Sequence, residues 1–174
     1  IAVTNSGVLT IDGLAGDDDI DIDVNSLAIP GPLADAPGII VIGNNPADEG
    51  DTLSVHGDEN GPDNALWAPT AVDGGTMRVA LQWIGVQSME RLLYDALDQN
   101  ESLTVRGAGR FVHTPAADRD EGTVQLDNWL AITYLDLGFT GAVRIDGTGA
   151  ADTLVARGTD GDDQLAVAAV MGTV

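Results

Sequence analysis

An acidic residue stands two positions before an aliphatic residue in each of five short segments. The five pairs are Asp18 and Ile20, Asp51 and Leu53, Glu101 and Leu103, Asp152 and Leu154, and Asp163 and Leu165. Residues two apart in a β-strand point to the same face, so each acid is expected to turn inward with its aliphatic partner. An inward carboxylate is costly unless a cation or several N–H groups receive it. Clustered carboxylates suit Ca²⁺ better than transition metals.

Two interpretations of these acids are open. They can bind calcium, or they can cap the N–H groups of turns as Asx-turns, with no metal. The acids crowd most closely at Asp17 to Asp19 and at Asp160 to Asp163, so these two segments are the best candidates for a metal site.

The segments around the acids repeat along the chain. DTLSVHG (51–57), ESLTVRG (101–107) and DTLVARG (152–158) share an acid, two apolar positions and a closing Gly, and they start 50 and 51 residues apart. A short apolar strand and a turn precede each of them, in IIVIG, LLYDAL and AVRIDG. The N-terminal segments VLTIDG and DIDIDV follow the same pattern, and GTDGDDQLAV begins a final copy at Gly158. Such a period predicts a repeat architecture.

Hydrophobic residues alternate with polar ones inside these segments, as Ile20, Ile22 and Val24 alternate with three Asp. A period of two predicts half-buried strands. Residues 89–97 also fit a helical spacing. The register of the repeats aligns Arg91 to Ala96 with Ala142 to Gly147, and therefore favours a strand there.

The repeats predict an all-β fold, a right-handed parallel β-solenoid, as a single domain over residues 1–174. Equivalent strands would stack every 50 residues or so, with two coils in each period and about seven coils in all. A β-sandwich is the main alternative. Residues 58–75 and 108–122 contain Pro and are irregular, so we expect them to be loops that leave the coil.

Three segments resemble the haemolysin-type (RTX) calcium-binding repeat G-G-x-G-x-D-x-U-x. Gly158 to Ala166 departs from it at Thr159, Gly13 to Asp21 departs at Leu14, and Gly147 to Val155 has Ala150 where Gly is expected. The resemblance implies that Asp side chains and Gly carbonyls coordinate calcium, with Asp18, Asp152 and Asp163 and turn glycines as ligands. Together with the crowded acids, the candidate metal residues are Gly13, Gly16, Asp17, Asp18, Asp19, Asp152, Gly158, Asp160, Gly161, Asp162 and Asp163. The longer unit also resembles the degenerate repeats of very large bacterial cell-surface proteins.

Composition excludes several classes of partner. The 174 residues carry 28 acids, of which 23 are Asp, against 7 bases, which are all Arg, and the formal net charge is −21. Binding to nucleic acid or an anionic membrane needs basic surface, so neither is expected. No apolar run approaches the ~18–20 residues of a membrane span. There is no Cys to form disulfides or a zinc finger. The acid excess is also compatible with adaptation to high salt.

We therefore expect an extracellular, non-enzymatic segment of a bacterial surface layer, fibre or filament, structural or adhesive and stiffened by calcium. The chain opens on Ile1 and looks like a processed product or a piece of a longer repeat protein. Its partners would be neighbouring repeats or further copies of itself, together with cell-surface polysaccharide. His56 and His113 lie in no nucleophile motif. The alternative is a carbohydrate-binding or carbohydrate-cleaving β-helix, which a groove lined by Trp67, Trp83 or Trp129 beside carboxylates would favour.

Overall fold

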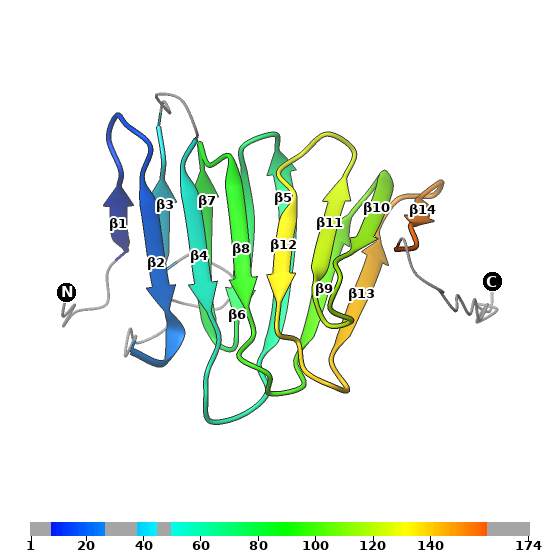
Figure 1. The fold of residues 1–174 in the computed structure, drawn as a ribbon. Coiled ribbons are helices and arrows are strands. Elements are labelled where there is room, and N and C mark those ends of the chain that lie inside the picture. Colours follow the sequence, from blue (N-terminus) through cyan, green and yellow to red (C-terminus); the bar gives the residue numbers. More distant parts are fainter. Residues whose placement is uncertain (1–7, 27–37, 45–49, 160–174) are drawn as a thin grey trace.

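The computed structural model describes residues 8–26, 38–44 and 50–159, and they form two mixed β-sheets of seven strands each (Figure 1). Sheet I contains, in spatial order, β1 (Leu9–Asp12), β3 (Ile39–Ile42), β7 (Gln82–Gln87), β6 (Gly74–Val79), β5 (Asn64–Ala71), β9 (Ser102–Gly107) and β13 (Ala142–Gly147). Sheet II contains β2 (Asp19–Asp23), β4 (Thr52–His56), β8 (Arg91–Asp95), β12 (Ile132–Leu135), β11 (Gly122–Leu126), β10 (Arg110–Pro115) and β14 (Thr153–Ala156). The one helical element is the 3₁₀ turn η1 (Val24–Ser26), so the described protein is all-β, and it contains no helix long and apolar enough to cross a membrane.

The chain passes back and forth between the two sheets. It runs from β1 in sheet I to β2 in sheet II, returns to β3, and crosses again to β4, so that most neighbours within a sheet are parallel. We call the segments that lead from sheet I to sheet II the corners; examples are residues 13–18, 88–90 and 148–152. The strand predicted at Arg91 to Ala96 is confirmed as β8.

Each sheet also holds one antiparallel insertion. Strands β5, β6 and β7 follow one another as hairpins in the middle of sheet I, and β10, β11 and β12 do the same in sheet II. The prediction that residues 58–75 and 108–122 are loops is therefore wrong for residues 64–71 and 110–115, which form β5 and β10, whereas residues 58–63 and 116–121 lie outside the strands. Pro69 lies where the β5 register shifts, and Pro115 ends β10, so neither proline has to donate a ladder hydrogen bond in mid-strand.

The repeats do not stack on one another as expected. DTLSVHG forms β4 in sheet II, ESLTVRG forms β9 in sheet I, and DTLVARG forms β14 in sheet II, where it pairs with β10. Parallel partners instead lie 30 to 45 residues apart, from Leu9 with Ile39 to Ile39 with Ile84. The prediction of stacking every 50 residues is wrong, because the similar segments are strands that follow turns in either sheet rather than strands of one column.

The core lies between the sheets, in rows of register partners that run across their full width. One row in sheet I consists of Leu9, Ile39, Ile84, Met77, Trp67, Val105 and Ile145. One row in sheet II consists of Ile20, Leu53, Leu92, Ile132, Val124, His113 and Ala156. The five inner members of the first row are fully buried, whereas Leu9 and Ile145 at its two ends are only partly buried. Each sheet therefore buries its middle well and its outermost strands less.

The buried Gly43 gives a test of this packing. A Cβ atom at Gly43 would collide with the carbonyl oxygen of Ser88 and would lie 2.5 Å from Oδ2 of Asp51. We expect Gly43→Ala to lower the free energy of unfolding by about 2–4 kcal/mol, measured by urea denaturation. Gly61→Ala is the matched control, since nothing lies within 4 Å of its Cβ position. Equal stability of the two variants would contradict the packing described for this corner.

Candidate functional site: corner carboxylates and an acidic depression

Carboxylates link successive corners on one side of the molecule. The backbone N–H of Asp18 donates to Oδ1 of Asp51 at 2.8 Å, and the backbone N–H of Asp51 donates to Oε2 of Glu90 at 2.8 Å. Each acid stands at the start of a sheet II strand and receives an amide from the corner before it. Charge-assisted bonds of this kind are stronger than neutral ones, so the acids hold neighbouring corners together.

Asp152 does the same at the far end of the molecule. Its Oδ1 accepts the N–H of Gly109, and its Oδ2 accepts the N–H of Gly149, both at 2.7 Å. Both carboxylate oxygens are thus occupied by turn amides. Other acids bond an amide two residues on, as Asx-turns: Asp12 to Leu14, Asp23 to Asn25, Asp58 to Asn60 and Asp95 to Leu97. Of the four described acids that stand two positions before an aliphatic residue, Asp51 and Asp152 therefore cap backbone N–H groups.

The inward direction of the acids is confirmed where burial is deepest. Asp51 is 0% exposed and Glu101 is 1% exposed, whereas Asp18 and Asp152 are partly buried. Glycine makes room for such carboxylates at the corners. A Cβ atom on Gly13 would lie 2.8 Å from Oδ2 of Asp18, closer than real Cβ atoms approach an oxygen.

The candidate metal residues at the N-terminal corner spread apart. Asp18 points inward, and its Oδ2 is buried without a hydrogen-bond partner, while Asp17 and Asp19 are exposed. Oδ1 of Asp17 accepts the N–H of Gly50 at 3.3 Å. Gly13 and Gly16 flank the same turn. Among the described acids, Asp17, Asp18, Asp19 and Asp152 belong to no group of three or more side chains whose ligand atoms converge. Gly158 is exposed. Asp160, Gly161, Asp162 and Asp163 lie outside the described residues.

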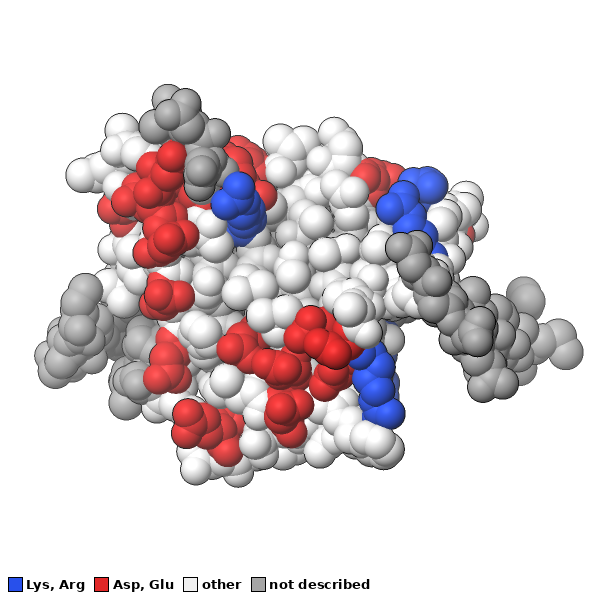
Figure 2. Space-filling model, viewed as in Figure 1, with Lys and Arg blue, Asp and Glu red and all other residues white. Residues whose placement is uncertain are grey.

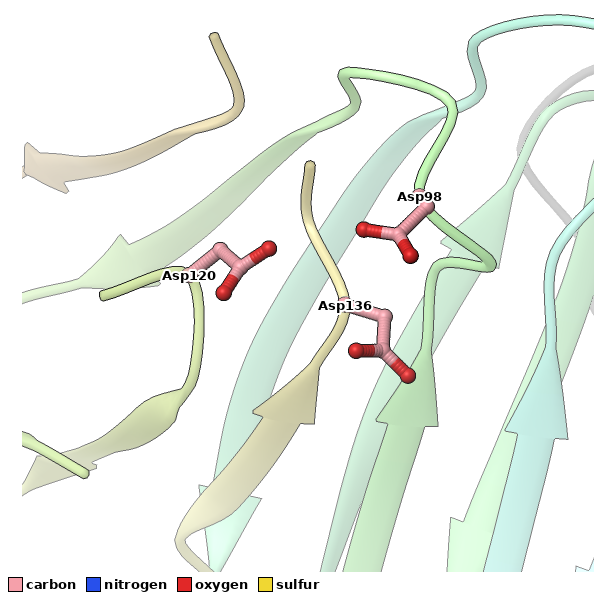
Figure 3. Close-up of side chains that lie close together, drawn as sticks. All are labelled: Asp98, Asp120 and Asp136. Atoms are coloured by element: carbon pink, nitrogen blue, oxygen red, sulfur yellow. The ribbon is translucent and has the colours of Figure 1, made fainter. Parts of the chain in front are cut away.

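A different set of three acids does converge. One carboxylate oxygen from each of Asp98, Asp120 and Asp136 lies within 4.8 Å of the others, and no other such group of Asp, Glu or His occurs among the described residues. Figure 3 shows the three side chains, which come from the β8–β9 turn, the β10–β11 turn and the β12–β13 turn. Hard carboxylate oxygens could hold a calcium ion here.

The three acids line an open depression of about 570 Å³ that also contains Asp118, Glu121 and Phe139. Burial, with the carboxylates of Asp98 and Asp95 next in effect, raises the pKa of Asp136 above its usual value. Arg119 also lines the depression, so one base stands against five acids; its guanidinium lies over the Phe139 ring, 3.8 Å from the centroid, and donates to the Phe139 carbonyl. The depression therefore concentrates negative charge.

Sequence spacing could not identify this group, because its members come from three turns 16 to 22 residues apart. The one local feature of this group is the tight turn that carries Asp98. Leu97 and Asp98 both have positive φ, 58° and 63°, and the N–H of Asp98 donates to the carbonyl of Asp136 at 2.7 Å. Only pairing of β8 with β12 brings the two turns together.

Glu101 is the most unusual ionisable group in the core. Neither of its carboxylate oxygens has a hydrogen bond of normal geometry, and the nearby Tyr94 hydroxyl is likewise buried without a partner. Burial raises the pKa of Glu101 to about 7; the amides of Glu101 and Gln99 oppose this shift, and the charges of Asp63 and Asp98 add to it. Burial also raises the pKa of Tyr94.

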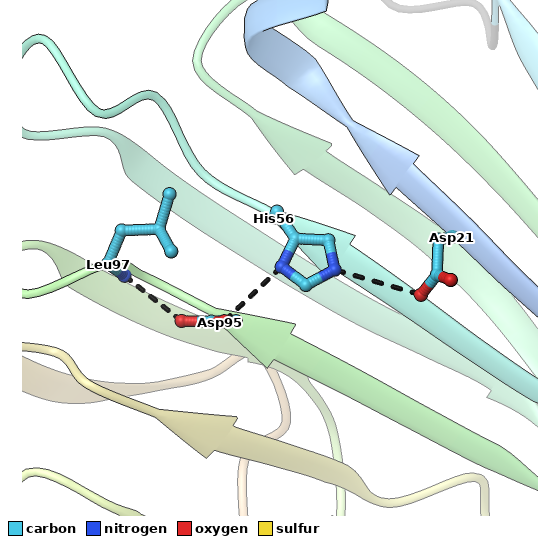
Figure 4. A network of polar contacts seen from close by, with 4 residues as sticks. All are labelled: Asp21, His56, Asp95 and Leu97. Atoms are coloured by element: carbon cyan, nitrogen blue, oxygen red, sulfur yellow. Dashed lines mark hydrogen bonds and ion pairs between the residues drawn. The ribbon is translucent and has the colours of Figure 1, made fainter.

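The two histidines occupy structural positions in strands. His56 lies on β4 between Asp95, 3.2 Å from Nδ1, and Asp21, 3.7 Å from Nε2 (Figure 4). Nε2 of His113 lies 2.7 Å from the Tyr134 hydroxyl, and burial lowers the pKa of His113. His56 is the last residue of β4.

The three tryptophans lie in different surroundings. Trp67 is fully buried and donates Nε1–H to the carbonyl of Leu130 at 3.3 Å. Trp83 lies under the guanidinium of Arg78, and Trp129 packs against the core. None of the three lines the acidic depression.

No protein-family model, curated protein or solved structure matches this chain. Function has to be argued from the geometry of the chain itself.

Asp152 can distinguish capping from metal binding. Asp152→Asn replaces one acceptor oxygen by an NH₂ group that faces another N–H, so we expect a loss of about 1–3 kcal/mol in the free energy of unfolding. The full difference in the free energy of unfolding should be present in EDTA, and millimolar calcium should not change it. Asp146→Asn is the control, since that exposed carboxylate pairs only with exposed Arg106 and should cost less than about 1 kcal/mol. A loss seen only in calcium would make Asp152 a metal ligand.

Glu101 should make the protein less stable as the pH rises. Its folded-state pKa of about 7 lies above the ordinary value of 4.5, so the folded state binds the proton more tightly and loses this advantage between about pH 5 and pH 8. Glu101→Gln should flatten that slope and, at pH 8, stabilise the protein by about 1–3 kcal/mol, measured by denaturation across the pH range. The exposed Glu59→Gln should leave the slope unchanged. An unaltered slope in Glu101→Gln would contradict this assignment.

Proposed function

We propose that the chain is a structural segment of an extracellular bacterial surface layer, fibre or filament, which is extended along its axis by strands added at its two ends. The added strands would come from neighbouring repeats or from further copies of the chain. The role is mechanical: the sheets transmit load through hydrogen bonds between strands, and the corner carboxylates keep successive corners in place.

The observation that carries the proposal is the open form of both ends. Among the described residues, β1 and β2 at one end and β13 and β14 at the other pair on one side only. Inward-facing positions that are buried in the middle of each sheet are exposed at these ends. Leu154 on β14 is 56% exposed, whereas its register partner Phe111 on β10 is 1% exposed. Unpaired strand edges with exposed apolar residues are sites of strand addition.

We assign the finer architecture to a right-handed β-solenoid with two hairpin insertions. The alternation of the chain between two sheets and the parallel pairing of β1 with β3 and of β2 with β4 support this description. The antiparallel insertions are features that a β-sandwich would share. Right-handedness is expected from the crossover rule for parallel strands.

Calcium stiffening belongs to the same proposal. The donor set that suits it is Asp98, Asp120 and Asp136, because a cation there would tie three turns together and relieve the repulsion among their carboxylates. The resemblance to RTX repeats supports a calcium role, and the capping by Asp152 shows that part of the acid population has another use.

Sedimentation velocity at increasing protein concentration tests the proposal, with thermal melts in EDTA and in millimolar calcium. We expect concentration-dependent association into elongated particles, visible by electron microscopy, and a higher melting temperature in calcium, since a ligand bound only by the folded state stabilises it. A monodisperse monomer at every concentration, together with a gene that encodes no flanking repeats, would overturn the axial role. An unchanged melting temperature would overturn the calcium role.

A further inference from the structure

We infer that the end formed by β13 and β14 binds the end formed by β1 and β2 of a second copy of this chain, head to tail, with the strands parallel. This inference rests on the proposed axial role and deepens it by naming the partner and the orientation. The contact uses two different surfaces, so it would not close on itself as a two-fold dimer does. A heterologous contact that does not close produces a filament.

Strand direction permits this contact at both sheets simultaneously. In sheet I, β1 runs parallel to β3 and β7; β6 reverses, and β5, β9 and β13 return to the direction of β1. In sheet II, β14 has the direction of β2 for the same reason, because the reversal at β11 is undone by β10. If a second copy is translated along the row of strands, its β1 meets β13 of the first copy in sheet I and its β2 meets β14 in sheet II. Both pairs are parallel, as β1 and β3 are within one chain.

The rows of register partners also place opposite charges together. Ile20 and Ala156 are the two ends of one row of sheet II, so Asp21 and Arg157 occupy the next row on the outward face. Continuation of that row into a second copy sets Arg157 beside Asp21, whose side chain is 72% exposed. Leu154, 56% exposed at the same end, would be covered by the added strand.

The two ends also differ in overall charge, in the direction that favours contact between them. Residues 8–26 carry six acids and no base, whereas residues 142–159 carry Arg144 and Arg157 against Asp146 and Asp152. Figure 2 shows acidic groups along the β2 end of this face, and basic groups toward the end that carries β10 and β14. A contact between two β1–β2 ends would set six carboxylates against six, which disfavours head-to-head pairing.

Disulfide trapping tests the orientation, because the natural chain has no Cys. Asp19 and Val155 occupy one outward row, where adjacent strands would lie about 4.8 Å apart, within the range that a disulfide spans. We expect a mixture of Asp19→Cys and Val155→Cys chains to give heterodimers on mild oxidation and few homodimers. A double variant with both cysteines should give a ladder of longer oligomers.

Charge reversal tests the contact itself. Arg157→Glu should weaken self-association about tenfold by sedimentation, and the added change Asp21→Arg should restore it. The control is Arg91→Glu, which also changes the net charge from −21 to −23, at an exposed residue of β8 in the middle of sheet II. Circular dichroism of each variant checks that the fold is retained.

The outcomes separate this inference from the proposed function. Association with homodimeric cross-links, or association insensitive to Arg157→Glu, would overturn the head-to-tail contact and leave the axial role intact. Absence of both association and cross-links would overturn the head-to-tail contact and, if the gene encodes no flanking repeats, the axial role as well. Protection of the introduced thiol of the Val155→Cys variant from thiol reagents in a monomer would show that another part of the same chain covers this end, which also excludes the contact.

Discussion

The structure depends on how backbone N–H groups are satisfied where the chain turns from one sheet to the other. Where the chain crosses between sheets, the backbone N–H groups at the corner have no carbonyl acceptor in a neighbouring strand. A buried N–H group without an acceptor is costly. Carboxylates of the adjacent corner supply the acceptors: Asp51 for the amide of Asp18, Glu90 for that of Asp51, and Asp152 for that of Gly109. Glycines such as Gly13 and Gly43 are needed beside them, because a Cβ atom would occupy the space of the carboxylate. The corner acid and the corner glycine are therefore one structural unit, and it couples each pass of the chain to the next.

This coupling explains much of the excess of Asp. A short acidic side chain reaches an amide of a neighbouring corner or one two residues ahead, and both arrangements recur in the described residues. It also explains why net charge alone gives little information about function. Most of the acids at the corners accept N–H groups. Asp120 also accepts an N–H, from Gly138 at 3.2 Å, but the carboxylates of Asp98, Asp120 and Asp136 face one another as well, and the charges of Asp98 and Asp120 add to burial in raising the pKa of Asp136. The first group stabilises the scaffold, and only the second has the donor geometry of a cation site.

The sequence predicted the β-class of the fold, the strands β1 to β4, β8, β9, β13 and β14, and the inward direction of Asp51 and Glu101, because a period of two and an acid two before an aliphatic residue are local signals. It failed at β5 and β10, where proline suggested loops although Pro69 and Pro115 occupy positions that tolerate the missing N–H. It also failed on the stacking of the repeats, because similarity between segments does not reveal whether they join the same sheet. Asp98, Asp120 and Asp136 were out of reach for the same reason, since their proximity follows from strand pairing across two hairpins.

Amide hydrogen exchange at the corners tests the central claim most directly. If carboxylates of adjacent corners hold them, the N–H groups of Asp18, Asp51 and Gly109 will exchange as slowly as those of the neighbouring strands, in EDTA as well as in calcium. Rapid exchange at these three amides, or protection that appears only when calcium is added, would contradict the account and would assign the corner acids to a metal.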